Sequence, residues 1–496
     1  MKKALFIIAG ISFFCQCARK EPPIAYKEEL FWNQASYATR MLNHILADSS
    51  QIIWSTGNHT SEMVPLGAVG PRQWLNRLQG ICANTDIGNV MKDAIAEGHT
   101  VILVIGDGMG MTHMSLPILL NKAEHISQPT SFETIMREGI SAMCTNQLTD
   151  YVVTGSAEAA TAIASGSRAL TSMIGINDDG YPVRTVLDSA ESLGYPTGLL
   201  TDTRITHATP AGFYANILDR GDEDTIAWDL AVQNRIEVLM GGGARFFIPE
   251  SAKVGDHPAF TTLDKQLDCQ SGRKDKTDLI QEMQNQGYRV IASQNQMDTL
   301  TANGQPLLGL FAGDAMSAAI DRDDEPTSQP GLNRMTEVAL QQLQAPQKPF
   351  FLMVECGRID WEAHANDAGA VLVAVKEMDT VLQTCYHYYQ KDPEHTLLIF
   401  TADHETGGMG ISYYVDRKHP LTRDLASGVS WETSVHPLAF TGFKKLAQQK
   451  MSLFKLLQSA QSAQDLARLI ETNTAFTISP SDAERVMELV IKSEIY

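Results

Sequence analysis

The chain has 496 residues, of which 44% are hydrophobic and 20% are charged, and its formal net charge at pH 7 is −19. This composition is typical of a globular protein with ample capacity for a core. The negative charge excludes a sequence-wide attraction to nucleic acid or to an anionic membrane surface. Because it also repels anionic substrates, any phosphate-binding site would need its own buried positive charge, from metal ions or an arginine.

The first 17 residues are typical of an export signal. Lys2 and Lys3 precede an apolar stretch over residues 4–14, which is too short to span a bilayer. Cys15 and Cys17 follow directly, so lipid attachment is an alternative to simple cleavage; Cys17 is the better candidate, although the preceding residues match the usual small-residue site poorly. We expect an exported protein without a transmembrane span, either periplasmic or lipid-anchored at the outer membrane.

The five other cysteines are widely spaced and show no paired pattern. They therefore predict neither a disulfide framework nor a zinc–thiolate site. We expect most of them to be buried as apolar residues. They are Cys82, Cys144, Cys269, Cys356 and Cys385.

The segment after the signal, over residues 25–98, has a helical pattern with polar breaks and no recognisable chemistry. From residue 99 onward, short apolar runs alternate with longer amphipathic stretches. The apolar runs predict buried strands at 101–105, 197–200, 236–240, 307–311, 350–354 and 396–400. The stretches between them predict helices at 185–193, 222–232, 276–286, 334–343 and 368–389.

Buried strands that alternate with helices predict an α/β fold, a doubly wound and mostly parallel sheet with helices on both faces. We assign this catalytic domain to residues 99–415 and a helical C-terminal extension to residues 416–496. The helices of that extension are predicted at 443–457, 464–471 and 481–491. In a doubly wound sheet, functional sites form at the carboxyl ends of the strands.

Asp107 follows the first of these strands and lies between glycines. A carboxylate at the carboxyl end of a buried strand leaves room there for a metal ion to approach. The alternative is an aspartate that caps the next helix. Asp107 by itself does not distinguish the two.

Ser156 follows Gly155 and precedes an alanine-rich stretch that favours a helix. Backbone N–H groups at a helix N-terminus favour a phosphate, but an unaided serine hydroxyl is a weak nucleophile. No Gly-x-Ser-x-Gly elbow surrounds it, which argues against a hydrolase triad. By itself, Ser156 fits a capping serine better than a nucleophile.

His207, Thr209 and Arg220 form a further group in the run THATPAGFYANILDR. Thr209 offers a hard oxygen ligand, and Arg220 can grip phosphate oxygens with two N–H groups. Without other motifs nearby, Arg220 would be interpreted as a surface residue.

Two more strand ends carry ligand-type side chains. Glu355, Asp360 and His364 follow the strand at 350–354, and Asp403 and His404 follow the strand at 396–400. Asp360 and His364 are four positions apart and share one face of a helix, and mixed carboxylate and imidazole ligands suit zinc. A surface salt bridge is the weaker alternative, because ligands at three strand ends form a specific signal.

Together these runs resemble the alkaline phosphatase family. IGDGMG, SAEAATA, THATPAGFYA, LMGGGARFF, VECGRIDWEAH and TADHETGG occur in the family's order, over roughly residues 100 to 410. The resemblance implies an enzyme that hydrolyses small phosphate monoesters through a phosphoseryl intermediate on Ser156. It further implies two zinc ions, one magnesium ion and a homodimer.

The resemblance also implies which side chains hold the ions. Asp107, Asp403 and His404 would hold the zinc that activates Ser156. Asp360 and His364 would hold the other zinc, which activates water.

The implied magnesium ligands are Asp107, Thr209 and Glu355, with His207 as a direct ligand or in the outer shell. Arg220 would bind the non-bridging phosphate oxygens.

Two departures from the family pattern lie close to the phosphate. Gly155 stands where many members carry an aspartate that braces the arginine, so Arg220 is expected to be looser here. Trp361 occupies a position often held by lysine or histidine and cannot donate charge to phosphate.

The third departure concerns the final zinc ligand. In the family this is a histidine in a Thr-Gly-Gly-His-Thr-Gly-like stretch near the C-terminus, and this chain has none there. His436 is a possible substitute, His419 a weaker one. We expect the last strand and its histidine to be missing, which leaves the second zinc under-coordinated. The alternatives to an active phosphatase are an impaired homologue that binds phosphate or metal, and a related phosphodiesterase or sulfatase.

Overall fold

The structure is a computed structural model, and it describes residues 38–47, 50–233, 235–260, 269–322 and 329–494. The predicted export signal, with Cys15 and Cys17, lies outside these residues. In the described part of the chain, no helix combines the length and the apolar character needed to cross a membrane.

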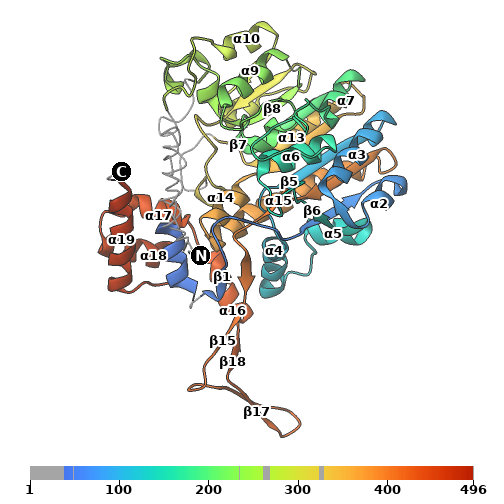
Figure 1. Cartoon of the computed structure of the whole chain (residues 1–496). Helices are drawn as coiled ribbons and strands as arrows, with labels where there is room; N and C mark the ends of the chain where they lie inside the picture. The colour runs from blue at the N-terminus through green and yellow to red at the C-terminus, as the bar shows by residue number, and fades with distance from the viewer. Residues whose placement is uncertain (1–37, 48–49, 234, 261–268, 323–328, 495–496) are drawn as a thin grey trace, which may run out of the picture.

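A ten-stranded sheet forms the centre of the molecule, in the order β4-β6-β3-β12-β5-β11-β7-β8-β10-β9 (Figure 1). All pairs from β12 to β9 are parallel, whereas β3 is antiparallel to both of its neighbours. The predicted doubly wound sheet is therefore confirmed. The strands that correspond to the predicted runs are β5 (Thr100–Gly106), β7 (Thr197–Arg204), β8 (Val238–Gly242), β10 (Leu307–Leu310), β11 (Phe351–Cys356) and β12 (Thr396–Thr401). The edge strand beside β10 is β9 (Arg289–Ile291).

The central strands are apolar along their whole length because helices cover both faces of the sheet. Every residue of β5, β11 and β12 is buried. One helical layer contains α3 (Asn84–Ala96), α6 (Ser156–Ser165), α7 (Val186–Ser192), α9 (Glu223–Gln233) and α10 (Leu279–Asn285). The other contains α4 (Met111–Glu124), α5 (Ser131–Glu138), α13 (Leu332–Gln344) and α15 (Ala368–Tyr389).

The segment before residue 99 differs from its predicted helical character. Its described part contains a helix over residues 38–47, α2 (Arg72–Leu78) and α3, but also the strands β1 (Ile52–Trp54), β2 (His59–Thr60), β3 (Val64–Val69) and β4 (Gly80–Ala83). All six residues of β3 are buried, and this strand lies between β12 and β6 in the main sheet. A short apolar run that ends at Gly70 and Pro71 is typical of a buried strand, and this pattern was the signal for β3.

The region after residue 411 also differs from its prediction. An extended arm projects from the body, built from β15 (Tyr413–Val415) with β18 (Val435–Pro437) and from β16 (Leu421–Asp424) with β17 (Ser430–Thr433) (Figure 1). The expected helices begin only beyond this arm. They are α16 (Phe440–Phe443), α17 (Leu453–Ser459), α18 (Ala463–Asn473) and α19 (Pro480–Glu494).

Candidate active site

The carboxyl ends of three adjacent strands bring the first group of acidic side chains together. Asp107 follows β5, Glu355 lies near the end of β11, and Asp403 and His404 follow β12. The three strands are parallel and in register, so their ends meet at the same edge of the sheet. Ligand atoms of Asp107, Asp403 and His404 lie within 4.8 Å of one another, and all three residues are fully buried.

Ser156 is the first residue of α6, and its hydroxyl faces this group. Its Oγ lies 3.3 Å from Nε2 of His404, which in turn lies 3.5 Å from Oδ1 of Asp107 and 3.2 Å from Oδ2 of Asp403. Glu158 caps the start of α6, because its carboxylate accepts a hydrogen bond from the backbone N–H group of Gly155. It also accepts one from the backbone N–H group of Ser172, in the loop that follows the helix. The serine is therefore held rigidly at the edge of the acidic group.

A threonine determines which nitrogen of His404 is free. Thr406 donates its single hydroxyl proton to Oδ1 of Asp360 at 2.5 Å. Its oxygen therefore accepts from Nδ1 of His404, 3.3 Å away. Nε2 of His404 then carries a lone pair that points toward Ser156 and the carboxylates, which is the state required of a metal ligand.

A second group of ligands lies beside the first and contains two imidazoles whose tautomers are also fixed. Nδ1 of His59 lies 2.9 Å from the carbonyl oxygen of Thr154, and Nδ1 of His364 lies 2.7 Å from that of Gly57. Because a carbonyl only accepts, both Nδ1 atoms donate, so each imidazole in its neutral form has the Nε2 lone pair that a cation ligand needs. These Nε2 atoms are 3.2 Å apart and lie 3.8 Å and 3.3 Å from the Asp360 carboxylate. Imidazole nitrogens beside a carboxylate are ligand types that suit zinc, and His59, Asp360 and His404 together form a group that could hold a metal ion.

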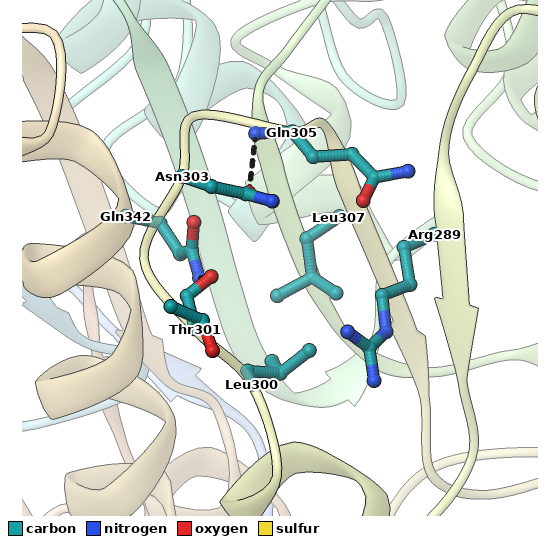
Figure 2. Close-up of a pocket in the computed structure, with 7 residues that line it drawn as sticks. All are labelled: Arg289, Leu300, Thr301, Asn303, Gln305, Leu307 and Gln342. Atoms are coloured by element: carbon teal, nitrogen blue, oxygen red, sulfur yellow. Dashed lines mark hydrogen bonds between the residues drawn. The ribbon is translucent and has the colours of Figure 1, made fainter.

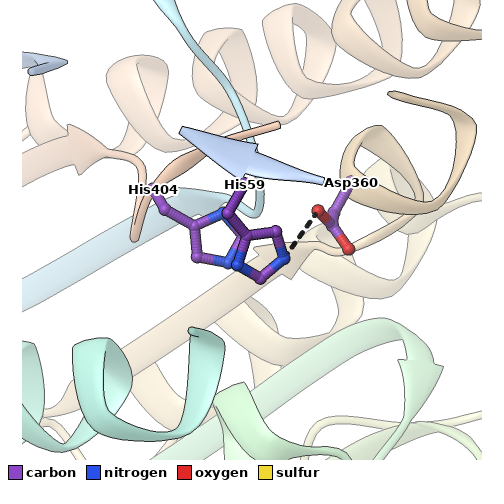
Figure 3. A group of neighbouring side chains, drawn as sticks. All are labelled: His59, Asp360 and His404. Carbon is purple, nitrogen blue, oxygen red and sulfur yellow. Dashed lines mark ion pairs between the residues drawn. The ribbon is translucent and has the colours of Figure 1, made fainter. Parts of the chain in front are cut away.

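His59 was absent from the sequence prediction. It lies on β2, which pairs with β13 (Glu405–Thr406), and its ring stacks on that of His404 with centroids 3.6 Å apart. Figure 3 shows His59, His404 and Asp360 as neighbours. A further histidine, which the sequence analysis did not include, therefore lies beside Asp360. The signal was the run Thr-Gly-Asn-His-Thr at residues 56–60, which matches the stretch sought near the other end of the chain.

The two substitutes considered for that ligand lie elsewhere. His436 is in β18 of the arm, where its ring stacks on Tyr414. His419 is exposed and pairs with Asp416. Neither belongs to a group of potential metal ligands among the described residues.

A third group of ligands lies on the other side of Asp107. It consists of Asp107, His207 and Glu355, and Thr209 donates to Oδ2 of Asp107 at 3.3 Å. One oxygen of Glu355 accepts hydrogen bonds from Thr201 and Thr203, which fixes the carboxylate. These oxygen-rich surroundings suit a hard cation such as Mg²⁺.

Arg220 is held by His207 rather than by an acidic side chain. Its Nη2 lies 2.9 Å from Nε2 of His207, and because a guanidinium only donates, this imidazole nitrogen accepts. The ring of His207 in turn packs edge-on against Trp361. The proton of neutral His207 is therefore on Nδ1 in this arrangement, and His207 supports Arg220 while it also belongs to the third group of potential ligands.

Buried atoms without partners in the described structure show that the first and third groups fit cations. Oδ1 of Asp107, Oδ2 of Asp403 and Oε1 of Glu355 are buried and accept no hydrogen bond within the described part of the structure. Burial, and after it the negative charges of Asp403, Asp360 and Glu355, hold the pKa of Asp107 well above its usual range. Burial likewise raises the pKa of Asp403 and of Glu355 to about 7. Divalent cations would supply the missing partners and neutralise this repulsion.

The groups differ in their access to solvent. The side chains of His59 and His364 are 19% and 34% exposed, whereas those of Asp107 and Asp403 are fully buried. The second group is thus the open side of the site, and Ser156 lies on the closed side. A separate small pocket near β9 and β10, lined by polar residues such as Arg289, Asn303 and Gln305, contains no carboxylate, histidine or cysteine and belongs to a different part of the molecule (Figure 2).

The fold and the site together support a metal-dependent hydrolase, and the comparisons with known proteins specify the family. The family model described as alkaline phosphatase matches residues 99–429. The chain is 32% identical to alkaline phosphatase 4 of Bacillus subtilis over 368 residues, which cover 71% of each protein. It is also 32% identical to the repressible alkaline phosphatase of Saccharomyces cerevisiae over 349 residues, 66% of this chain and 59% of that one. The chain belongs to the alkaline phosphatase family.

Solved structures agree with this assignment. The crystal structure of Thermus thermophilus alkaline phosphatase has a TM-score of 0.64 and 25% identity, over 80% of this chain and 76% of that one. A mutant of the TAB5 alkaline phosphatase, described with magnesium bound in its M3 site, has a TM-score of 0.50 and 25% identity, over 69% and 88% of the two chains. Family and fold support metal-dependent phosphomonoester hydrolysis. The family match begins after His59, so an alignment in chain order does not reach this residue.

Proposed function

We propose that this protein hydrolyses phosphate monoesters through a phosphoseryl intermediate on Ser156, with two zinc ions and one magnesium ion bound. The observation that carries the proposal is the position of the Ser156 hydroxyl, 3.3 Å from a His404 lone pair and beside buried carboxylate oxygens that have no partner. Asp107, Asp403 and His404 would hold the zinc ion next to Ser156. Bound cations would lower the pKa of the serine hydroxyl and neutralise the charge that develops on the phosphoryl group.

The closed and open sides of the site support one direction for the proposed reaction. In an in-line displacement, the attacking and leaving oxygens lie on opposite sides of phosphorus. The Ser156 oxygen attacks from the closed side, so the bond from phosphorus to the alcohol oxygen breaks toward His59 and His364. The alcohol leaves by this open side, and the water that later cleaves the phosphoserine and releases phosphate enters by the same route.

We propose that His59 completes the second zinc site together with Asp360 and His364. Its Nδ1–H is fixed by the Thr154 carbonyl, and its Nε2 lone pair faces that of His364. This arrangement provides the third protein ligand that zinc in a catalytic site usually has. With His59 in this role, the second zinc would have three protein ligands, which supports an active phosphatase over an impaired homologue.

Magnesium would be held by Asp107, Thr209 and Glu355, which supply the hard oxygen ligands that this ion prefers. The proposed role of Arg220 is to bind the non-bridging phosphate oxygens, as expected of a guanidinium. His207 would support Arg220, in place of the aspartate that many family members carry at the position of Gly155.

The function is tested by the hydrolysis of p-nitrophenyl phosphate in zinc and magnesium. We expect activity in the wild-type protein and the loss of both turnover and a trapped phosphoenzyme in Ser156→Ala. Bis-p-nitrophenyl phosphate and p-nitrophenyl sulfate serve as controls, since a preference for either would favour the phosphodiesterase or sulfatase alternative. A wild-type protein that binds zinc but hydrolyses none of the three substrates would support the impaired homologue.

We further propose an exported homodimer in which the arm contacts a second copy of the chain. A two-stranded ribbon is marginally stable alone in water, and this one exposes large apolar side chains, including Tyr413 (60% exposed), Val429 (59%) and Trp431 (45%). Sedimentation equilibrium tests the proposal. We expect a dimer for the wild type and a monomer when Tyr413 and Trp431 are both replaced by serine; two monomeric samples would contradict it.

A further inference from the structure

Two of the cysteines, far apart in the sequence, lie side by side at one edge of the sheet. Cys82 is in β4, an edge strand among the described residues, and Cys144 is in the neighbouring strand β6 (Ile140–Thr145). The two strands are parallel, and Cys82 is the register partner of Cys144, so both side chains project from the same face. Both are buried, at 6% and 0% exposure.

We propose that Cys82 and Cys144 form a disulfide bond that ties β4 to the rest of the sheet. Register partners on neighbouring strands have Cα atoms about 4.8 Å apart, which is inside the range of roughly 4.4–6.8 Å that disulfides span. In a disulfide the two Cβ atoms lie somewhat closer together than the spacing between neighbouring strands, so the bond requires a small movement of the backbone. The edge strand β4 can make this adjustment because β6 alone holds it in the sheet.

The surroundings of the two sulfurs favour thiol–disulfide exchange. A hydrogen bond from Cys144 lowers the pKa of Cys82 below its usual value, and the same bond together with burial raises the pKa of Cys144. Their other contacts are weak, since Cys82 Sγ lies 3.8 Å from the Met143 carbonyl oxygen and Cys144 Sγ lies 3.6 Å from that of Thr145. Cys82 is therefore the attacking thiol of the pair.

The oxidant is a small-molecule or protein disulfide that the chain meets while β4 is not yet covered. The Cys82 thiolate attacks one sulfur of this disulfide, and one thiolate leaves. The Cys144 thiolate then attacks the mixed disulfide and displaces the second thiolate. Two protons and two electrons pass from the cysteine pair to the oxidant, which is reduced to two thiols.

The bond would act on the helix that supports the nucleophile. β4 leads directly into α3, and α3 packs against α6, whose first residue is Ser156. Fixing β4 to β6 therefore limits the motion of α3 beneath α6. A cross-link between residues 82 and 144 also closes a long loop, which reduces the entropy of the unfolded chain.

The test is a peptide map of the full protein after refolding in reduced and oxidised glutathione. Free thiols are alkylated with iodoacetamide under denaturing conditions, the protein is digested without reductant, and the peptides are identified by mass spectrometry. We expect a peptide pair joined through Cys82 and Cys144, about 2 Da lighter than the two thiol peptides together. Alkylation of both cysteines, or a bond to a different cysteine, would overturn the proposal.

Two variants complete the test. Cys385→Ala, which removes a buried cysteine in α15, should keep the cross-link. Cys144→Ala should leave Cys82 open to alkylation. The oxidised wild type should melt several degrees higher than the same protein after reduction, and Cys144→Ala should show no such shift; an equal shift in both would show that another bond is responsible.

Discussion

Hydrogen bonds from backbone carbonyls and one threonine control the imidazoles at the candidate active site. The carbonyls of Thr154 and Gly57 accept from Nδ1 of His59 and His364, and Thr406 accepts from Nδ1 of His404. Each contact leaves an Nε2 lone pair directed at the acidic groups. Such partners orient metal ligands and fix their tautomers, so they matter almost as much as the ligands themselves.

The proposed role of His59 gives the first prediction at this scale. We expect His59→Ala to lower kcat/KM for p-nitrophenyl phosphate by about 100-fold. Loss of a side chain that hydrogen-bonds to a metal ligand lowers activity by roughly 10- to 100-fold, and loss of a direct ligand should lower it at least as much. Zinc content measured after dialysis should fall as well.

His436→Ala is the matched control, because this histidine lies in the arm and stacks only on Tyr414 among the described aromatic contacts. Its activity and zinc content should stay at the wild-type level. If His436→Ala loses zinc and His59→Ala keeps it, the assignment of His59 is wrong.

Thr406 gives a second prediction. In Thr406→Val, the hydroxyl that bridges Asp360 and His404 is lost while the shape of the side chain is kept. We expect a decrease in kcat/KM of roughly 10- to 100-fold, the usual effect of removing an outer partner. Thr336→Val is the control, since Thr336 is equally buried but donates within helix α13 to the Leu332 carbonyl. Equal losses in the two variants would show that the effect comes from burying valine in general.

At the scale of elements, the position of the nucleophile depends on how closely two helices approach. A methyl group added at Gly88 in α3 would lie 2.4 Å from the backbone nitrogen of Gly166 and 2.7 Å from the carbonyl oxygen of Ile163, at the end of α6. Backbone atoms cannot move aside as a flexible side chain can. Only glycine at this position allows α3 to support α6 at the observed distance.

Gly88→Ala should therefore separate the two helices. We expect a loss of about 1–3 kcal/mol in the free energy of unfolding, measured by urea denaturation, as is typical of overpacking. Gly442→Ala in α16 is the control, because its added methyl would meet only the flexible end of Leu438, at 3.0 Å. A Gly88→Ala protein as stable as Gly442→Ala would show that the helices adjust without cost.

At the scale of the whole molecule, the N-terminal part of the described chain is built into both the sheet and the site. β3 fills the position between β12 and β6, and β2 brings His59 to β13. In this chain the Thr-Gly-Asn-His-Thr run and its strand therefore precede the other ligands, whereas in the family the corresponding stretch follows them. The spatial arrangement of the site is compatible with either order, because only the final positions of the side chains determine which ions they hold.

The unbalanced acidic groups give a prediction for the stability of the whole protein. A chelator should lower the melting temperature, and zinc at 100 times its Kd should restore about 2.7 kcal/mol, because the ion binds the folded state. Asp107→Asn removes one of the mutually repelling carboxylates. Without metal, this variant should have a higher melting temperature than the wild type. Zinc should raise its melting temperature by less than it raises that of the wild type. A wild-type melting temperature that does not respond to chelator or zinc would contradict the metal sites.

The sequence by itself was sufficient for most of the parallel part of the main sheet, from β12 to β10, and for most ligand-type residues. Continuous apolar runs followed by acidic residues and histidines predicted β5, β11 and β12 and the side chains at their ends. These features are local, because a strand and the residue that follows it are neighbours along the chain. The edge at which parallel strands end is then a consequence of the fold class.

Other features were decided only by the tertiary structure. Thr60 and Glu405, which pair where β2 meets β13, are 345 positions apart, and Cys82 and Cys144 meet across two strands. No local periodicity encodes such partners. The free nitrogen of each imidazole likewise depends on a carbonyl or hydroxyl that the folded backbone places beside it. Burial and strand pairing, which arise only when distant segments pack together, placed His59 beside Asp360 and His404.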